Sequence, residues 1–402
     1  MSDARQKRQA ILMSAYTYYE SDSRVIREAE AAVGGGFEVD FIALQKAGTP
    51  KTETIHSVRV VRLSQAKYRG RGHLKYFLAY AEFFLRCLVK TTALFFKRRY
   101  RVIHVNNMPD FLVFTTIIPR LFGTKVILDI HDPMPNTFAS KFKGLENGFF
   151  YRLLLWQERL SAAYCSQVIT VHHPVKDGIL VKHGLRPESI RVIANFADSE
   201  LFPLRKSFSV DGKTRFIFHG TILERSGLRL LMMAVVGMRH KDRISMKIIG
   251  EGDFSSTLLD MIESFDLAQV VEFDHHCYPA HSISERISDC NAGIVPLEIS
   301  SVTKYALPLK LLEYMSLGLP VVTVRSEAIS YYFGEEDCLF FDANNPQSLS
   351  DVLDSIAENP KLLFRYRERS LALRERFSWA GEKIKYVALL RQLTGVAERS
   401  GV

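Results

Sequence analysis

Short apolar runs alternate along the chain with longer stretches in which apolar residues recur at helical spacing. The runs are rich in Val, Ile, Leu and Phe, as expected for strands buried on both faces of a parallel sheet. In the first half they occupy 10–16, 38–44, 58–63, 101–107, 125–132, 167–171 and 190–195. After a polar connector over 203–213 they resume at 215–220, 245–252, 270–274, 292–297, 320–324 and 338–341. Strands that alternate with helices form βαβ units, so the pattern predicts an α/β protein with two doubly wound, Rossmann-like domains.

The same pattern gives the expected domain boundaries. We predict an N-terminal domain over 1–203, a C-terminal domain over 204–376, and a C-terminal helix over 377–402 that crosses back to the N-terminal domain. A length of 402 residues suits this organisation. Two such domains would face a central crevice, where loops and helix N-termini at the carboxyl ends of the strands bind a ligand.

Composition narrows the class of protein. Hydrophobic residues make up 47% of the chain and charged residues 24%, which excludes a disordered or collagenous protein. Five widely spaced cysteines without a CxxC pair argue against a disulfide framework or a thiolate zinc site. The apolar run near the N-terminus is too short for a signal peptide, so a cytoplasmic location is expected.

The formal net charge of +9 is concentrated in one segment, 59–101, which has twelve basic residues and a single acid, Glu82. Within it, 76–96 is apolar and long enough to span a bilayer, but Glu82, Arg86 and Lys90 would make spanning costly. A helix lying along an anionic membrane surface fits this pattern, and a buried helix with a charged edge fits it equally well. Nucleic acid is disfavoured because the charges flank an aliphatic run and are not interleaved with aromatics. Of the two interpretations we take the first as the prediction, peripheral association with the inner face of a membrane, and the buried helix stays open.

Candidate chemistry lies mainly in the second half. The loop after the first strand, 14–24, has no glycine, which excludes a GxGxxG dinucleotide site. In 219–235 a strand is followed by Gly220, a basic loop with Arg225, and a helix, an arrangement suited to a phosphate. In 296–324 a long loop leads to a helix with Lys310 and Glu313, suited to a diphosphate and a ribose diol respectively.

Taken together, GTxxxRxGL, IIGEG, VPL and LPxKLLEYMSLGLPVV resemble the nucleotide-sugar domain of GT-B-fold glycosyltransferases, in particular family 4 (glycosyl transferases group 1). The N-terminal half resembles the acceptor domain of the same family through 101–111 and 127–135. The resemblance implies a retaining enzyme that uses a nucleoside-diphosphate sugar.

The resemblance also implies roles for individual residues. Arg225 and Lys310 would hold the diphosphate and stabilise the leaving group, and Glu313 would bind the ribose. His131 would touch the transferred sugar. The donor site is completed by Gly220, Gly250, Glu251, Gly252 and Leu311, and the acceptor side by Arg24 and Asp132.

The chain departs from the family pattern at several of these positions. Tyr305 stands where the first motif glutamate is expected, Pro308 replaces a glycine, and Ser226 replaces a lysine. In the N-terminal loop, Ser21 to Arg24 replaces a glycine turn, and Arg24 is expected to face the crevice instead. No Asp-x-Asp occurs, so no metal cofactor is expected.

These features predict a glycosyltransferase that acts on a polyprenyl-diphosphate-linked sugar or another glycolipid in the synthesis of exopolysaccharide, O-antigen or capsule. Two alternatives stay open. One is a nucleotide-sugar epimerase of the same fold, and the other is a non-catalytic membrane-surface protein on a decayed transferase scaffold.

Overall fold

The computed structural model describes residues 9–68, 70, 73–141, 148–205, 207–301 and 303–396. The chain forms two compact units, Met1–Ala194 with Glu382–Val402, and Asn195–Gly381. The first boundary falls earlier than the expected 203/204, because the chain joins the second unit as soon as β8 ends. There the Phe196 ring contacts the Phe377 ring at a centroid distance of 5.3 Å. Residues 397–402 of the expected C-terminal segment lie outside the described residues.

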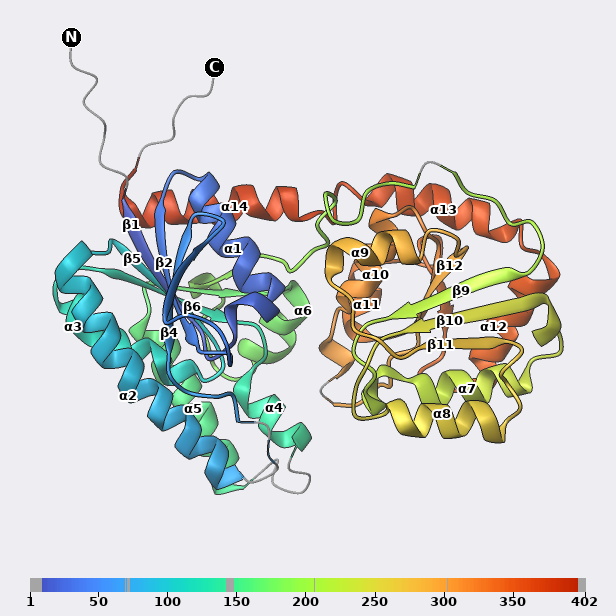
Figure 1. The fold of residues 1–402 in the computed structure, drawn as a ribbon, viewed down its shortest axis with the longest axis horizontal. Helices are drawn as coiled ribbons and strands as arrows, with labels where there is room; N and C mark the ends of the chain where they lie inside the picture. The colour runs from blue at the N-terminus through green and yellow to red at the C-terminus, as the bar shows by residue number, and fades with distance from the viewer. Residues whose placement is uncertain are drawn as a thin grey trace, which may run out of the picture. The chain divides into compact units, whose positions relative to one another are not determined.

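The first unit is built on an eight-stranded sheet in the order β3-β4-β2-β1-β5-β6-β7-β8 (Figure 1). Its strands are β1 (Ala10–Ser14), β2 (Glu38–Leu44), β3 (Thr52–Ile55), β4 (Val58–Leu63), β5 (Val102–Asn106), β6 (Lys125–Ile130), β7 (Gln167–Thr170) and β8 (Ile190–Val192). All neighbours are parallel except β3 and β4. The sequence pattern did not predict β3, because this edge strand is short, largely exposed and polar.

Helices cover both faces of this sheet. They are α1 (Ser23–Gly34), α2 (His73–Arg98), α3 (Ile117–Leu121), α4 (Met134–Lys141), α5 (Phe149–Tyr164), α6 (His173–Val175) and the C-terminal α14 (Trp379–Thr394). From Glu382 onward α14 belongs to the first unit. It lies beside α1 (Figure 1), close enough that a Cβ at Gly35 would sit 2.8 Å from the Val387 side chain. The 3-10 helix η2 (Asp110–Thr116) contacts both α2 and α5.

The second unit has a six-stranded, fully parallel sheet in the order β11-β10-β9-β12-β13-β14. Its strands are β9 (Thr214–His219), β10 (Ile244–Ile249), β11 (Val271–Asp274), β12 (Ala292–Val295), β13 (Val321–Val324) and β14 (Leu339–Phe341). Its helices are α7 (Leu228–Gly237), α8 (Ser255–Ser264), α9 (Ala280–Arg286), α10 (Leu309–Ser316), α11 (Glu327–Tyr332), α12 (Pro346–Glu358) and α13 (Leu362–Leu373). The strand order reverses between β9 and β12, the position where doubly wound sheets bind ligands.

Both units therefore have the predicted architecture of two Rossmann-like α/β domains. In the second unit the central strands are almost wholly buried, since helices pack on both faces of the sheet. Among the described residues, no helix is both long and apolar enough to cross a membrane.

Candidate functional site

The switch point of the second unit gathers the predicted donor residues. β9 ends at His219 and is followed by Gly220, while β12 leads through a long loop to α10, which carries Lys310 and Glu313. Lys310 and Gly220 are adjacent, because a Cβ at Gly220 would lie 3.5 Å from Lys310 Nζ. The carboxyl end of β9 and the first turns of α10 thus form one cluster.

Glu313 is held in place by a histidine that the sequence reasoning missed. His219 Nε2 lies 2.9 Å from Glu313 Oε2, and the two side chains are 8% and 12% exposed. Because a carboxylate only accepts hydrogen bonds, Nε2 carries the proton and donates it to Glu313. The Tyr314 hydroxyl lies 3.0 Å from both the His219 backbone nitrogen and Nδ1, so its oxygen accepts from the first while its hydrogen is donated to the second. The position of the Glu313 carboxylate is therefore set by two side chains and one backbone amide.

Lys310 is a cation placed in an apolar setting. Its ammonium lies 3.5 Å from the centroid of the Phe218 ring, and no ion pair of Lys310 is found in the described part of the chain. Burial lowers the pKa of Lys310 to about 7, and the negative charge of Glu313 opposes this shift only in part. A polyanion bound beside Nζ would supply the missing partner.

Arg225 lies in the loop between β9 and α7 and is exposed. Among the residues that the structure describes, the Arg225 guanidinium has no hydrogen-bond or ion-pair partner. Gly227, which precedes α7, has a φ of 76°, and a Cβ there would lie 1.9 Å from Pro296 O. Only glycine fits this contact, which brings the Arg225 loop against the end of β12. Ser226, in the place of the expected lysine, bonds the Thr221 carbonyl at 3.1 Å.

The glycines of 250–252 have a packing role that the sequence did not predict. Gly250 has a φ of 145°, and a Cβ there would lie 1.9 Å from Gly220 O. The Gly250 amide donates to Asp274 O at 3.0 Å, and the Gly252 amide to Ser255 Oγ at 3.0 Å. These glycines let two loops approach each other, and their amides are already bonded. Glu251 between them is exposed.

One predicted donor position needs correction. Leu311 has no exposed surface and packs in the core of the second unit, so its side chain is not a donor contact. Tyr305, in the place of the first motif glutamate, is 8% exposed, and the Lys304 ammonium lies 4.7 Å from its ring centroid. Pro308 directly precedes α10 as its N-cap residue.

In the first unit, His131 follows β6 and is fixed from two sides. Its Nε2 lies 2.8 Å from Asp129 Oδ2, and its backbone amide donates to Asn107 Oδ1 at 2.9 Å. The imidazole is 17% exposed, so its edge can be reached by a ligand. Asp132, the next residue, is exposed, and its backbone carbonyl accepts from Asn107 Nδ2 at 2.7 Å.

Arg24, which was predicted to face the crevice, is buried inside the first unit. It is 4% exposed, and its guanidinium binds both oxygens of Asp129 at 2.8–3.1 Å. Its Nη1 donates to Ile193 O at 3.3 Å, which ties α1 to the end of the β-sheet. Burial opposes ionisation of Asp129, but the Arg24 charge holds the pKa of that carboxyl well below its ordinary value. Arg24 is therefore a buried counter-ion beneath His131 and not an acceptor contact.

The same cluster contains the residues of the described chain that come closest to a metal site. Ligand atoms of Glu28, His104 and Asp129 lie within 4.8 Å of one another. The Arg24 guanidinium, however, already stands 3.1 Å from Glu28 Oε1 and 2.8 Å from Asp129 Oδ2. A divalent ion would compete with this fixed positive charge, so the donor set does not fit a metal.

The two halves of the chain match two family models. Residues 23–201 match the model "Glycosyltransferase Family 4", and residues 203–372 match "Glycosyl transferases group 1". Two curated relatives are putative colanic acid biosynthesis glycosyltransferases, both called WcaL, from Salmonella typhimurium and Escherichia coli. Each is 26% identical to this chain, over 159 and 165 residues, which are 38% and 39% of this chain. The match spans about two fifths of each relative, 39% of its length.

Solved structures of the same fold cover nearly the whole chain. Sucrose-phosphate synthase from Thermosynechococcus elongatus has a TM-score of 0.77 at 18% identity, covering 97% of this chain and 100% of that one. Anabaena HepE, solved with UDP and glucose, has a TM-score of 0.68 at 13% identity and covers 96% and 100%. WaaG, described as a glycosyltransferase involved in lipopolysaccharide biosynthesis, has a TM-score of 0.65 at 13% identity and covers 94% and 99%. The chain has the GT-B fold and belongs to the glycosyltransferases that these two family models describe, family 4 and group 1.

Proposed function

We propose that the protein transfers a sugar from a nucleoside-diphosphate sugar to an acceptor, with retention of the anomeric configuration. The observation that carries the proposal is the cluster at the end of β9. There Glu313 is held by His219, and Lys310 forms no ion pair among the described residues. The carboxylate can accept hydrogen bonds from a ribose diol, and the cation can pair with a diphosphate. A nucleoside diphosphate contains both groups. Anabaena HepE, a structural neighbour, has been solved in complex with UDP-glucose, which supports this ligand class.

Each residue then has a role in the reaction. The leaving nucleoside diphosphate gains negative charge as the glycosidic bond breaks, and the cations Lys310 and Arg225 stabilise that charge. Glu313 orients the ribose, with Gly220 beside the diphosphate. His131 contacts the transferred sugar with its exposed edge, and Asp129 fixes the direction of its ring. No step requires a metal ion.

We further propose that the acceptor is a polyprenyl-diphosphate-linked sugar or another glycolipid in surface polysaccharide synthesis. The resemblance to WcaL supports the pathway class. The apolar and basic segment 59–101 supports a peripheral location at the cytoplasmic face of a membrane.

A panel of nucleotides tests the donor site. UDP, GDP and their sugars are added to the purified protein, and the melting temperature is recorded. Specific binding raises it by mass action. We expect one nucleotide family to give a rise that Glu313→Gln abolishes, because an amide cannot replace both carboxylate acceptors. The matched control is Glu327→Gln, which removes an exposed carboxylate paired with Lys304 and should keep the rise. A folded wild-type protein that responds to no nucleotide would exclude the transferase.

His219 gives a second, finer prediction. In His219→Phe the ring stays, but Glu313 and Tyr314 lose their partner. We expect the KM for the donor to increase about tenfold while kcat changes less, since one hydrogen bond to a charged group is lost. The control is His240→Phe, which breaks a similar 3.0 Å contact between a histidine and Glu358. An unchanged KM in His219→Phe would show that Glu313 does not need this support.

A further inference from the structure

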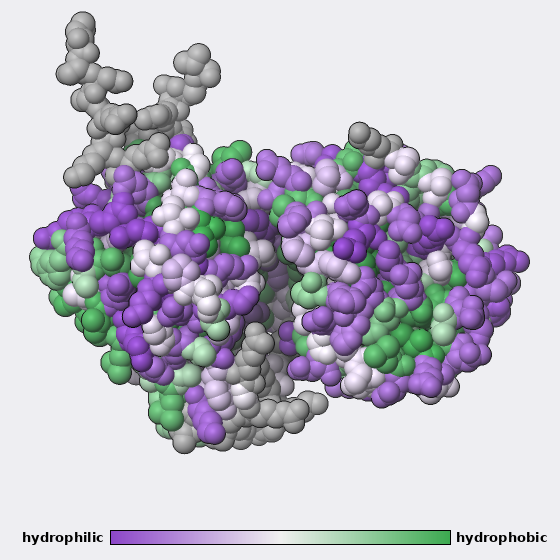
Figure 2. All heavy atoms as spheres, in the orientation of Figure 1, coloured by the Kyte–Doolittle hydropathy of each residue, from purple (hydrophilic) through white to green (hydrophobic). Residues whose placement is uncertain are grey.

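One face of the first unit exposes an unusual number of large hydrophobic side chains. Thirteen of the exposed ones in the described chain come from α2, from α3 and the residue after it, and from α5. They are Phe77, Leu78, Leu85, Val89, Phe96, Ile117, Leu121, Phe122, Phe149, Phe150, Leu153, Trp156 and Leu160. Figure 2 shows hydrophobic side chains along the edge formed by α2 and α3. α2 and α5 both pack against η2, so their exposed rows belong to the same side of the sheet.

α5 is amphipathic, but its apolar face is exposed and its polar face is buried. Phe149, Leu153, Trp156 and Leu160 follow one another at intervals of four, three and four residues and therefore line one face of the helix. These side chains are 75%, 42%, 59% and 40% exposed. The buried face instead contains Glu158, which has no exposed surface and bonds His183 Nδ1 at 2.6 Å. A helix that buries a carboxylate and exposes tryptophan and leucine is built to meet an apolar phase.

The structure also changes the picture of the basic segment 59–101. Several of its cations are neutralised within the protein: Arg59 pairs with Asp40, Arg62 with Glu20 and Glu53, Arg86 with Glu82, and Arg98 with Glu38 and Asp40. Arg69 and Arg71 lie outside the described residues. Cations without an ion pair in the described chain are Lys75, Lys90, Lys97, Arg99 and Arg101. The field of the segment is therefore weaker than its charge of +11 suggests.

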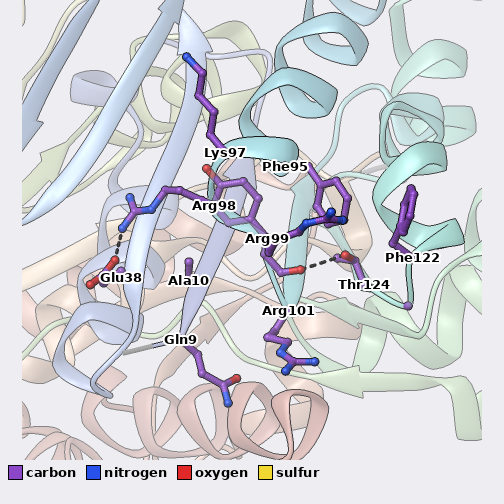
Figure 3. Close-up of a pocket in the computed structure, with 12 residues that line it drawn as sticks. Gln9, Ala10, Glu38, Phe95, Lys97, Arg98, Arg99, Arg101, Phe122 and Thr124 are labelled. Carbon is purple, nitrogen blue, oxygen red and sulfur yellow. Dashed lines mark hydrogen bonds and ion pairs between the residues drawn. The ribbon is translucent and has the colours of Figure 1, made fainter. Parts of the chain in front are cut away.

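The exposed charges that do border the hydrophobic face are nearly all positive. Among the described residues of α2, α3 and α5, the only exposed acid is Glu82, and it is paired with Arg86 at 2.8 Å. Arg152 is exposed next to Leu153. At the end of α2, Arg99 lies between the rings of Phe95 and Phe122, at 5.0 and 5.2 Å from their centroids (Figure 3). A cation whose stem follows apolar rings is suited to the headgroup level of a bilayer.

A pocket of about 660 Å³ opens at this end of α2. It is lined by residues from the amino ends of the strands, among them Ala10, Arg101 and Thr124. His131 follows the carboxyl end of β6, at the opposite edge of the same sheet. This pocket is therefore separate from the predicted sugar contact, and its position beside the exposed Phe96 and Phe122 joins it to the hydrophobic face.

We propose that the face formed by α2, α3 and α5 docks onto the surface of a bilayer that contains anionic lipid, and that the exposed row of α5 is its main anchor. The inference rests on the proposed action at a membrane and names the surface and the interaction that provide the contact. Most of the binding to the bilayer is assigned to the inserted apolar side chains of α5, which lies outside 59–101. The cations of 59–101 contribute the smaller part.

Tryptophan fluorescence tests the proposal directly, because the chain has only two tryptophans. Trp379 is 6% exposed, and Trp379→Phe leaves Trp156 as the sole reporter. On addition of vesicles of phosphatidylcholine with phosphatidylglycerol, we expect the Trp156 emission to shift to shorter wavelength and the protein to cosediment. In about 0.5 M salt most of the binding should persist, since apolar insertion is not screened. If the emission does not move and the protein stays in the supernatant, the proposal is wrong.

Two sets of variants identify the anchor. The triple variant Leu153→Gln, Trp156→Gln and Leu160→Gln should bind these vesicles at least about tenfold more weakly, because three insertions are lost. The control changes Met233, Val236 and Phe265 of the second unit, which are also exposed, to Gln and should bind as the wild type does. Circular dichroism confirms folding, and an unchanged thermal shift with nucleotide shows that the donor site is unaffected.

The alternatives give different results. If Lys90→Gln with Lys97→Gln abolishes binding while the α5 triple variant retains it, the anchor is the basic segment and the proposal fails. If the wild type sediments as a dimer that the α5 changes convert to a monomer, and neither protein binds vesicles, the face is an interface between copies of the chain.

Discussion

Arg24→Met should lower the free energy of unfolding by about 3–5 kcal/mol, the usual cost of removing one partner of a buried ion pair. The variant leaves the Asp129 carboxylate without the guanidinium that binds both its oxygens, and Glu28 loses its 3.1 Å contact as well. The replacement side chain has a similar length but supplies no hydrogen bond to Ile193 O. Urea denaturation should show a lower midpoint with an unchanged slope, as expected when stability alone is altered.

The control for this experiment is Arg86→Met. It removes the half-exposed ion pair between Arg86 and Glu82, one helical turn apart, and should lower the free energy of unfolding by no more than about 0.5 kcal/mol. Arg24→Lys should recover part of the loss. A decrease in Arg24→Met no larger than that in Arg86→Met would contradict the charged pair described here.

The direction of the Asp129 pKa also fixes how this stabilisation depends on pH. The folded-state pKa lies well below the ordinary value. The contribution is therefore complete above about pH 4, where the unfolded carboxyl is ionised, and is lost as the pH falls below that toward the folded-state pKa.

The largest functional effect is expected at Lys310. Lys310→Met should reduce kcat/KM by about 10²- to 10³-fold, because a fixed cation no longer meets the charge on the leaving diphosphate. Stability should not fall, since methionine fills the same space beside the Phe218 ring without a desolvated ammonium. The control is Lys304→Met, whose ammonium pairs with Glu327 at 2.8 Å and is not in the donor cluster.

The pH dependence of donor affinity provides the signature of Lys310. Burial lowers its pKa to about 7 in the free protein, and a bound diphosphate would raise it again, so binding takes up a proton. Affinity for the nucleotide sugar should be highest below pH 7 and fall by up to about tenfold per pH unit above it. Calorimetry from pH 6 to 9 measures this directly. A wild-type affinity that does not change with pH would contradict the prediction, and a Lys310→Met variant that keeps the decline would assign it to another group.

Much of the fold could be read from residue pattern alone. In the described part of the chain, thirteen of the fourteen strands lie where the apolar runs predicted them, because strands buried on both faces have few polar residues. The exception, β3, is an exposed polar edge and lacks that signal. The sequence also predicted a helix that carries both Lys310 and Glu313. Because these residues are three positions apart, they lie on the same face of that helix.

What the sequence could not determine depends on partners that are distant along the chain. Arg24 was predicted to face the crevice, because the sequence does not show that Asp129, 105 positions later, lies against its guanidinium. His219 has its hydrogen-bond partners only because α10 brings Glu313 and Tyr314 to the end of β9. The helical spacing of the apolar residues in α5 does not by itself show whether its apolar face points inward or outward. Only the packing of Glu158 against His183 turns that face outward, because a buried carboxylate needs its hydrogen-bond partner inside the protein.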